Sequence, residues 1–100
     1  MALEISGNVE LVDGITLPSC YGRTDYRVNS DSSEVVITTN YWKDLQSYTD
    51  GKQPLRVAFS TGGRYTYDRT TDGSDVLDFT NLKIKTELEA LGFSVVITEL

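Results

Sequence analysis

The sequence predicts an α+β fold that is mainly β: an antiparallel sheet, or a partly open barrel or sandwich, with one C-terminal helix packed on it and a final strand. Two observations lead to this prediction. Short runs of β-branched or alternating apolar residues recur over the first seventy positions, and one stretch, residues 75–91, has the apolar spacing of a full helix. A chain of 100 residues can build one modest hydrophobic core, so we expect a single domain over residues 1–100.

The first strand is expected at the N-terminus. Residues 2–12 alternate apolar and polar side chains, which predicts a half-buried strand. Gly7 lies in the middle of this segment and indicates a bulge or a break into two strands. Asp13-Gly14 is a turn signal, so the strand is predicted to end there.

Three more strands are predicted before residue 43. Residues 15–17 precede Pro18, which cannot donate to a ladder, so they should form no more than an edge strand. Residues 21–28 are expected to form a further short strand. Residues 34–42 give the strongest strand prediction, because five consecutive β-branched residues are extended, after one Asn, by Tyr-Trp, and we expect an internal strand there.

The following segment predicts an irregular excursion and a hairpin. Residues 43–48 are expected to form one or two helical turns, ended by Asp-Gly. Residues 55–60 alternate again and predict another strand. Residues 61–63, Thr-Gly-Gly, predict a hairpin turn from which residues 64–69 return as the paired strand.

The helix over residues 75–91 is marked at both ends. Ser74 is a good N-cap, and Gly92 stands where a left-handed residue ends a helix. Residues 93–98 are rich in β-branched side chains and should return to the sheet as the last strand. Four apolar residues share one narrow stripe of the helix, at about 100° per residue: Leu77, Ile84, Leu88 and Leu91.

Phe79 and Leu82 point roughly opposite to this stripe. A helix that is apolar on two sides is either sandwiched or in contact with another subunit. Alternatively, the helix begins later, near Thr80 or Asn81, and residues 76–79 form a lead-in segment. The sequence leaves both alternatives open.

The charge argues against two classes of partner. The net charge is −6, from fifteen acidic and nine basic residues with no run of Lys or Arg. Such a surface lacks the counterion release that drives nucleic-acid binding, and it is repelled by anionic lipid, so we expect no nucleic acid and no membrane as partner. The first residues lack a basic n-region, and eighteen apolar residues never follow one another, so the chain is expected to be soluble and untargeted.

The side-chain inventory argues against an enzyme. Histidine is absent, which removes the commonest general base, the Ser-His and Cys-His pairs and the best zinc ligand. We therefore expect no catalytic residue and no cofactor. Cys20 is the lone cysteine, so no intrachain disulfide can form and a reducing compartment fits best. With no histidine beside it, Cys20 is expected to be a buried or semi-buried structural thiol.

Two motifs imitate binding sites. Residues 61–64, Thr-Gly-Gly-Arg, resemble a phosphate loop but lack its spacing and its Lys-Ser/Thr, so a hairpin turn fits better. Four aspartates near the start of the helix imitate an EF-hand loop, but Phe79 stands where a bidentate Glu is needed. Helix capping explains these carboxylates more simply, and no metal is expected. The four are Asp68, Asp72, Asp75 and Asp78.

The aromatic residues indicate a contact surface. Tyr and Trp anchor interfaces because they offer a large area at low entropy cost. The alternative is that most of them complete the core of a small sheet. Eight residues are the candidate contacts of a protein interface: Tyr41, Trp42, Tyr48, Lys52, Tyr65, Tyr67, Phe79 and Leu82.

Three parts of the chain carry a family resemblance: residues 9–17 with 20–23, residues 41–55 and residues 72–79. Together they resemble the small structural proteins encoded in the virion modules of tailed bacteriophages. The resemblance covers about half the chain and includes no catalytic or ligand motif, so it assigns no functional residue. It implies a virion subunit of the head, neck, tail or fibre region, assembled in the host cytoplasm through contacts with itself or other virion proteins.

Two functions follow as hypotheses. The first is a non-enzymatic structural subunit of a virion that forms a homo-oligomer. The second is a small binding or inhibitory module that recognises one protein or ligand through an aromatic patch.

Overall fold

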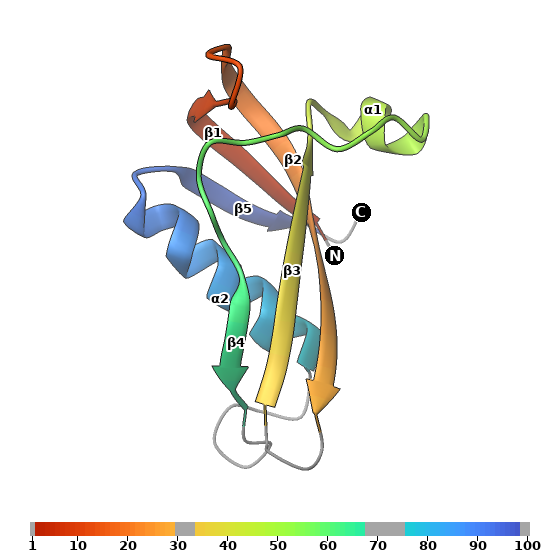
Figure 1. Ribbon diagram of the computed structural model, residues 1–100, viewed down its shortest axis with the longest axis vertical. Helices are drawn as coiled ribbons and strands as arrows, with labels where there is room; N and C mark the ends of the chain where they lie inside the picture. The colour runs from red at the N-terminus through yellow and green to blue at the C-terminus, as the bar shows by residue number, and fades with distance from the viewer. Residues whose placement is uncertain (1, 30–33, 68–75, 99–100) are drawn as a thin grey trace.

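The structure is a computed structural model that describes residues 2–29, 34–67 and 76–98. It confirms a mainly β fold with an open antiparallel sheet of five strands in the order β4-β3-β2-β1-β5 (Figure 1). The strands are β1 (Ala2–Glu10), β2 (Thr16–Asn29), β3 (Glu34–Trp42), β4 (Gly63–Thr66) and β5 (Ser94–Thr98). The helices are α1 (Leu45–Thr49) and α2 (Val76–Ala90), and α2 lies across one face of the sheet (Figure 1).

The bulge predicted at Gly7 is confirmed. The register of β1 against β2 shifts between Ser6 and Val9, and Gly7 has a φ of 139°. A Cβ atom on Gly7 would lie 2.9 Å from Cδ1 of Phe93, so the ring of Phe93 fills the space that a side chain would need. The bulge therefore needs glycine both for its backbone angle and for its packing.

The Asp13-Gly14 turn is also confirmed. The Gly14 N–H donates to the Leu11 carbonyl at 3.0 Å, and the Leu11 N–H donates to the Ile15 carbonyl at 2.8 Å. Gly14 has a φ of 91°, as the left-handed position of a three-residue hairpin loop requires. This loop joins β1 to β2.

Strand β2 corrects the prediction of two short strands at residues 15–17 and 21–28, because Thr16–Asn29 is one continuous strand. Pro18 is tolerated for two reasons. β3 pairs with β2 only from Tyr21 onward, so no N–H is needed at Pro18 on that side. On the other side, Pro18 lies opposite the bulge of β1, where the register shifts.

Strand β3 has the bounds predicted for it, Glu34–Trp42, and it is internal as predicted, since it pairs with β2 on one side and β4 on the other. The predicted helical turns after it are α1. The Asp44 side chain caps α1 by accepting a hydrogen bond from the Ser47 N–H at 2.7 Å. This backbone bond lowers the pKa of Asp44.

The hairpin predicted around residues 61–63 is wrong. Residues 55–60 form no strand, and β4 pairs with β3 instead, with Arg64 opposite Val36. Gly62 allows its backbone to approach β3 closely and does not form a hairpin turn. A Cβ atom there would lie 2.6 Å from the carbonyl oxygen of Ile37. Gly62 thus lets the chain pack closely against β3.

The alternation over residues 55–60 has a different explanation. This segment crosses from α1 towards β4. On the way, Val57 forms an isolated β-bridge with Leu11, the residue that follows β1. Its apolar side chains are half-buried and pack on the core: Leu55, Val57 and Phe59. Alternation therefore indicated correctly which side chains face inward, although no ladder forms.

Helix α2 begins at Val76, so the alternative start near Thr80 or Asn81 is wrong. Its end follows the prediction. Gly92, with a φ of 98°, donates its N–H to the Glu89 carbonyl at 3.0 Å, and the Phe93 N–H donates to the Leu88 carbonyl at 3.1 Å. These two bonds form a Schellman motif. Ser74 and Asp75 lie outside the described residues.

The buried face of α2 differs from the predicted stripe. Ile84 and Leu88 are fully buried, but Leu91 is 54% exposed because the helix ends at Ala90 and the chain turns away there. The sequence also did not predict that Asn81, a fully buried amide, contacts the sheet. The Asn81 side chain donates to the Leu77 carbonyl at 2.8 Å and accepts a hydrogen bond from Thr24 of β2 at 3.1 Å.

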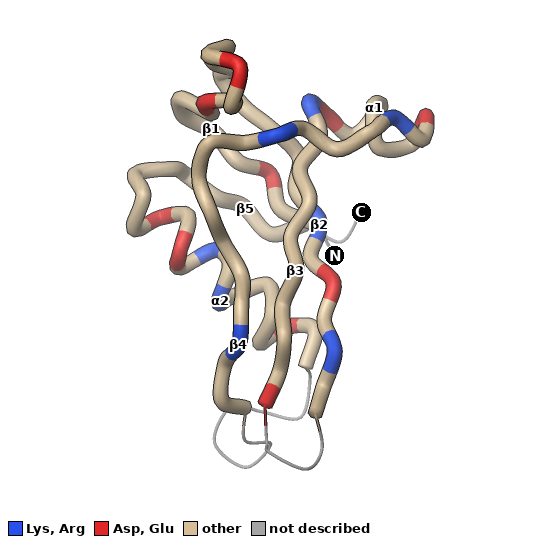
Figure 2. Tube along the Cα trace, viewed as in Figure 1, with Lys and Arg blue, Asp and Glu red and all other residues tan. Residues whose placement is uncertain are grey.

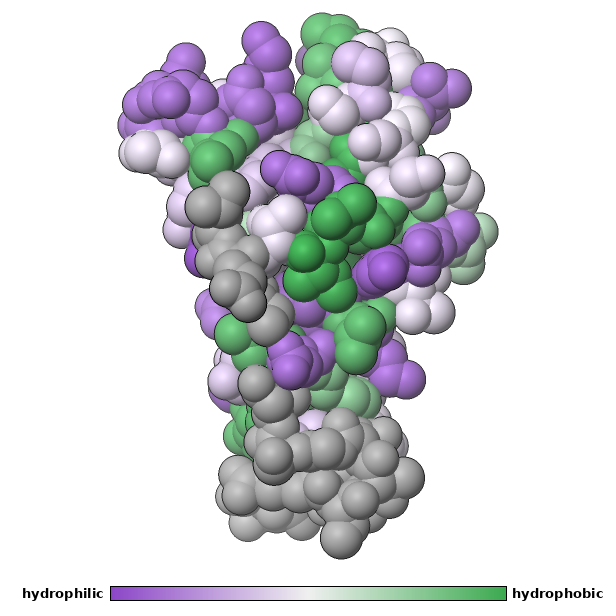
Figure 3. All heavy atoms as spheres, turned by 180° about the vertical axis from the view of Figure 1, so that it is seen from behind, coloured by the Kyte–Doolittle hydropathy of each residue, from purple (hydrophilic) through white to green (hydrophobic). Residues whose placement is uncertain are grey.

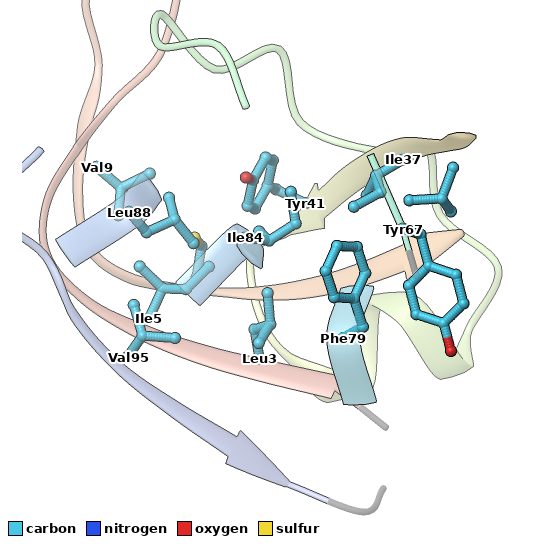
Figure 4. Close-up of a cluster of buried hydrophobic side chains, with 12 residues drawn as sticks. Leu3, Ile5, Val9, Ile37, Tyr41, Tyr67, Phe79, Ile84, Leu88 and Val95 are labelled. Atoms are coloured by element: carbon cyan, nitrogen blue, oxygen red, sulfur yellow. The ribbon is translucent and has the colours of Figure 1, made fainter. Parts of the chain in front are cut away.

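The core lies between α2 and the sheet (Figure 4). Figure 4 shows Val9 and Leu88 at one end of the cluster and Phe79 and Tyr67 at the other. The buried members come from four strands, α2 and the residue after β4: Leu3, Ile5, Val9, Cys20, Val35, Ile37, Tyr41, Tyr67, Phe79, Ile84, Leu88 and Val95. Burial of this apolar surface is the main favourable term in the stability of the fold.

Candidate functional site

The eight candidate contact residues divide into three groups by exposure. Three are buried, three are half-buried and two are exposed. The buried group is Tyr41, Tyr67 and Phe79; the half-buried group is Trp42, Tyr48 and Tyr65; the exposed group is Lys52 and Leu82. They therefore do not form one continuous aromatic patch.

The buried group belongs to the core, the alternative that the sequence left open. The rings of Tyr67 and Phe79 pack edge to face with centroids 4.9 Å apart, and Tyr41 packs in the same way on Phe59 at 5.3 Å. The Tyr41 hydroxyl is hydrogen-bonded to the Thr61 hydroxyl. Burial raises the pKa of Tyr41 to about 12. These rings stabilise the fold and present little surface to a partner.

Trp42 and Tyr48 pack against each other on the sheet face opposite to α2. Their ring centroids lie 4.8 Å apart, and Tyr48 also meets Tyr21 at 5.6 Å. The Arg23 guanidinium lies 4.6 Å from the centroid of Tyr48 and donates to the Tyr21 hydroxyl at 2.9 Å. We call these four residues, Tyr21, Arg23, Trp42 and Tyr48, the outer aromatic cluster.

The outer aromatic cluster ties α1 to the sheet. The Trp42 Nε1 donates to the Lys52 carbonyl at 2.9 Å, so the indole holds the segment that follows α1. Tyr21 stands directly opposite Trp42 in the β2–β3 ladder. Sequence reasoning missed Tyr21 and Arg23, although their separation by two places them on one face of a strand. The signal that they contact Trp42 is the register of the ladder, which the sequence did not reveal.

Tyr65 connects β4 to α2. Its hydroxyl donates a hydrogen bond to the Glu87 carboxylate. Burial is the main cause that raises the pKa of Tyr65. The hydrogen bond to Glu87 and the negative charge of Glu87 raise it further. The residue thus fastens the short edge strand to the helix, which sequence reasoning did not foresee.

The exposed apolar side chains lie in several separate places. Val12 and Ile15, at the tip of the β1–β2 hairpin, are 62% and 54% exposed. Leu45 on α1, Leu82 on α2 and Val96 on β5 are also exposed. Figure 3 shows hydrophobic side chains at mid-height on the rear of the molecule, where β5 and α2 lie. Among these residues, the sequence had singled out Leu82 alone as a contact.

A shallow hollow of about 340 Å³ lies on the sheet face opposite to α2. Arg27 of β2 and Arg64 of β4 flank Val36 of β3, and Arg64 pairs with Glu34 at 3.8 Å. Charges of both signs lie close together here, and both signs are spread over the described trace (Figure 2). The lining residues of this hollow include no nucleophile paired with a base.

Cys20 is buried, as the sequence predicted, with 4% of its surface exposed. Burial raises the pKa of its thiol to about 12, so the nucleophilic thiolate is suppressed at neutral pH. Of the four aspartates near the helix start, Asp68, Asp72 and Asp75 lie outside the described residues. Asp78 is in the first turn of α2, where its charge complements the helix dipole.

Within residues 2–29, 34–67 and 76–98, no three side chains of the metal-binding types gather around one point. In those same ranges, no helix has the length and apolar character to span a bilayer. No protein-family model, curated protein or solved structure matches the chain.

Proposed function

We propose that this chain is a non-enzymatic structural subunit of an assembly, in the head, neck, tail or fibre region of a tailed-phage virion. It works through contacts with copies of itself and with neighbouring virion proteins. The observation that carries the proposal is the spread of exposed aliphatic side chains over separate surfaces: the β1–β2 hairpin tip, α1, α2 and β5. A subunit with several neighbours needs several such surfaces.

The chemistry of the chain agrees with this role. With no histidine in the sequence and the Cys20 thiol buried, the commonest general base is missing and the thiol nucleophile is suppressed. Apolar burial supplies most of the association energy, on the order of 25 cal/mol per Å² before the entropic cost of docking. The resemblance of three stretches to small virion proteins supports the same role.

The alternative, a module that binds one partner through an aromatic patch, has weaker support. Tyr41, Tyr67 and Phe79 pack in the core, and Trp42 and Tyr48 pack on each other and on Tyr21. Few aromatic faces are left for a ligand, whereas aliphatic side chains are left at several places.

The mass of the purified chain in solution tests the proposal. Sedimentation velocity or light scattering at micromolar concentration should show a closed oligomer. A strict monomer that captures one soluble protein would favour the binding module instead. Mass spectrometry of purified particles tests the virion itself, because a structural subunit must be present in particles whose genome encodes it. Its absence from such particles would contradict that part of the proposal.

Lys52→Glu tests whether the segment after α1 is a contact surface. The Lys52 side chain is exposed, and only its backbone carbonyl holds the Trp42 indole, so the charge reversal should leave the fold intact. We expect weaker association, with an unfolding midpoint equal to that of wild type at concentrations where both chains are monomeric. Unchanged association would remove this segment from the interface but leave the other surfaces in place.

A further inference from the structure

Strand β5 forms one edge of the sheet, and its outer side has no described partner. β5 pairs with β1 on one side, from Ser94 opposite Ser6 to Thr98 opposite Ala2, and no strand follows it in the sheet order. In the described part of the chain, none of the turn, loop or cap hydrogen bonds between backbone groups involves Ser94–Thr98. A free row of backbone donors and acceptors is a template for another strand.

The other edge of the sheet is protected, which makes β5 distinct. β4 is four residues long, starts at Gly63 and carries the charged, exposed Arg64. Its Tyr65 is fastened to Glu87 of α2. β5 reads Ser-Val-Val-Ile-Thr, with no charge, no proline and no bulge in its ladder with β1. Charge and distortion are the usual means of blocking an edge, and β5 has neither.

The side-chain types of β5 read nearly the same from either end of the strand. If β5 is placed antiparallel to a copy of itself with Val96 at the centre, Ser94 faces the Thr98 of the copy and Val95 faces its Ile97. Hydroxyl then meets hydroxyl, and β-branched side chain meets β-branched side chain, which are favourable cross-strand pairs. The faces also agree, because residues that stand opposite each other project to the same side of a sheet.

This register fits the burial of each side chain. Val95 is buried against α2 and Ile97 is half-buried, so their pairs continue the helix-covered face. Val96 is 59% exposed on the other face and would meet the Val96 of the second copy on the symmetry axis. The chain as a whole has a net charge of −6, yet this strand brings no like charges together.

We propose that β5 of one chain pairs antiparallel with β5 of a second chain about a two-fold axis through Val96, joining two five-stranded sheets into one of ten. The inference deepens the proposed function, since it names a second copy as the occupant of one assembly surface. It can nevertheless be refuted without refuting the assembly role, because a subunit can assemble through other surfaces.

Disulfide trapping tests the register. In the proposed pair, the two Cα atoms of residue 96 lie about 4.5–5.5 Å apart, within the range that a disulfide spans. Val96→Cys should therefore form a covalent dimer under mild oxidation. Ser94→Cys is the control, because the two copies of residue 94 would lie roughly 13 Å apart along the strands and should not cross-link. Cys20 is buried in both variants and should not compete.

Charge placement tests the surface. Val96→Lys would put two like charges opposite each other and should weaken dimerisation by roughly tenfold or more. Val12→Lys is the matched control, since Val12 is 62% exposed, as Val96 is 59% exposed, but lies at the hairpin tip. It should leave the β5 dimer unchanged. At a concentration low enough for wild type to be monomeric, both variants should unfold at the wild-type midpoint, which separates lost pairing from lost folding.

The outcomes separate this inference from the proposed function. Cross-linking of Val96→Cys but not of Ser94→Cys, with dissociation by Val96→Lys alone, supports β5 pairing. An oligomer that persists in Val96→Lys and does not cross-link at residue 96 overturns β5 pairing and leaves the assembly role standing. A wild-type chain that is monomeric at every concentration overturns β5 pairing, and the assembly role then depends on its presence in particles.

Discussion

Replacing Trp42 by alanine should destabilise the fold rather than merely remove a contact surface. The indole is half-buried, packs edge to face on Tyr48 at 4.8 Å and donates to the Lys52 carbonyl at 2.9 Å. The hydrogen bond contributes about 1 kcal/mol and the ring pair about 1 kcal/mol beyond its buried area. With the lost burial of a half-covered ring, the total is roughly 2–3 kcal/mol. For a domain of this size, that lowers Tm by roughly 10–20 °C.

Urea and thermal unfolding followed by far-UV circular dichroism measure this change. Fluorescence cannot serve, because Trp42 is the single tryptophan. Trp42→Phe keeps a ring but loses the indole N–H, so it should cost about 1 kcal/mol. Val12→Ala is the control, because Val12 is 62% exposed at the tip of a hairpin, and it should change the free energy of unfolding by less than about 0.5 kcal/mol. If Trp42→Ala unfolds within that same margin of wild type, the outer aromatic cluster does not stabilise the fold and the reasoning is refuted.

Three other predictions concern the core, a close backbone approach and pH. Leu88→Ala should lower the free energy of unfolding in urea by about 2–5 kcal/mol, because Leu88 is fully buried. The same change at Leu82, which is 55% exposed, should lower it by less than about 0.5 kcal/mol. Similar values for the two variants would contradict the burial assigned to α2. Gly62→Ala should lower the unfolding midpoint in urea more than Gly14→Ala does. The two glycines have similar φ angles, 93° and 91°, but only a Cβ atom at residue 62 would clash with a backbone oxygen, at 2.6 Å. Equal midpoints would contradict that close approach. Burial raises the pKa of Cys20 from 9.0 to about 12, so its stabilising contribution is present below pH 9 and is lost as pH rises towards 12, by roughly 1 kcal/mol at pH 10. Cys20→Ala should lose less stability than wild type between pH 9 and pH 10, and parallel pH profiles would count against the buried thiol.

The elements that the sequence predicted well are those whose local signals agree with their tertiary setting. β3 is a run of β-branched residues and is buried between two strands, so propensity and burial act together. The end of α2 is fixed by Gly92 through two local hydrogen bonds. The bulge in β1 likewise depends on Gly7 itself.

The elements that the sequence predicted wrongly depend on distant partners. Pro18 was expected to interrupt a strand, but it lies where β2 needs no ladder bond on the β3 side. The glycines before β4 were expected to turn a hairpin, but Gly62 instead allows contact with Ile37. In both places the deciding neighbour is more than ten residues away, and no local pattern names it.

The candidate contact residues show the same limit. Aromatic composition alone could not separate a ring that completes the core, such as Phe79, from one that packs on the opposite face, such as Trp42. Nor could it show that α2 would bury Phe79 and leave Leu82 exposed, because both lie off the main apolar stripe. The free edge of β5 emerged only from the strand order, which places the C-terminal strand beside β1 at the end of the sheet.

Hydrogen exchange of the β5 amides over a dilution series tests most directly whether this chain works by pairing with its own copies. Alternate N–H groups of Ser94–Thr98 face β1, and the others face the free edge. At high concentration, the edge-facing amides should exchange as slowly as those bonded to β1, and dilution should make them fast while the amides of β3 stay protected. Fast exchange of the edge-facing amides at every concentration, in a sample that remains folded, would contradict the pairing of β5 with a second copy.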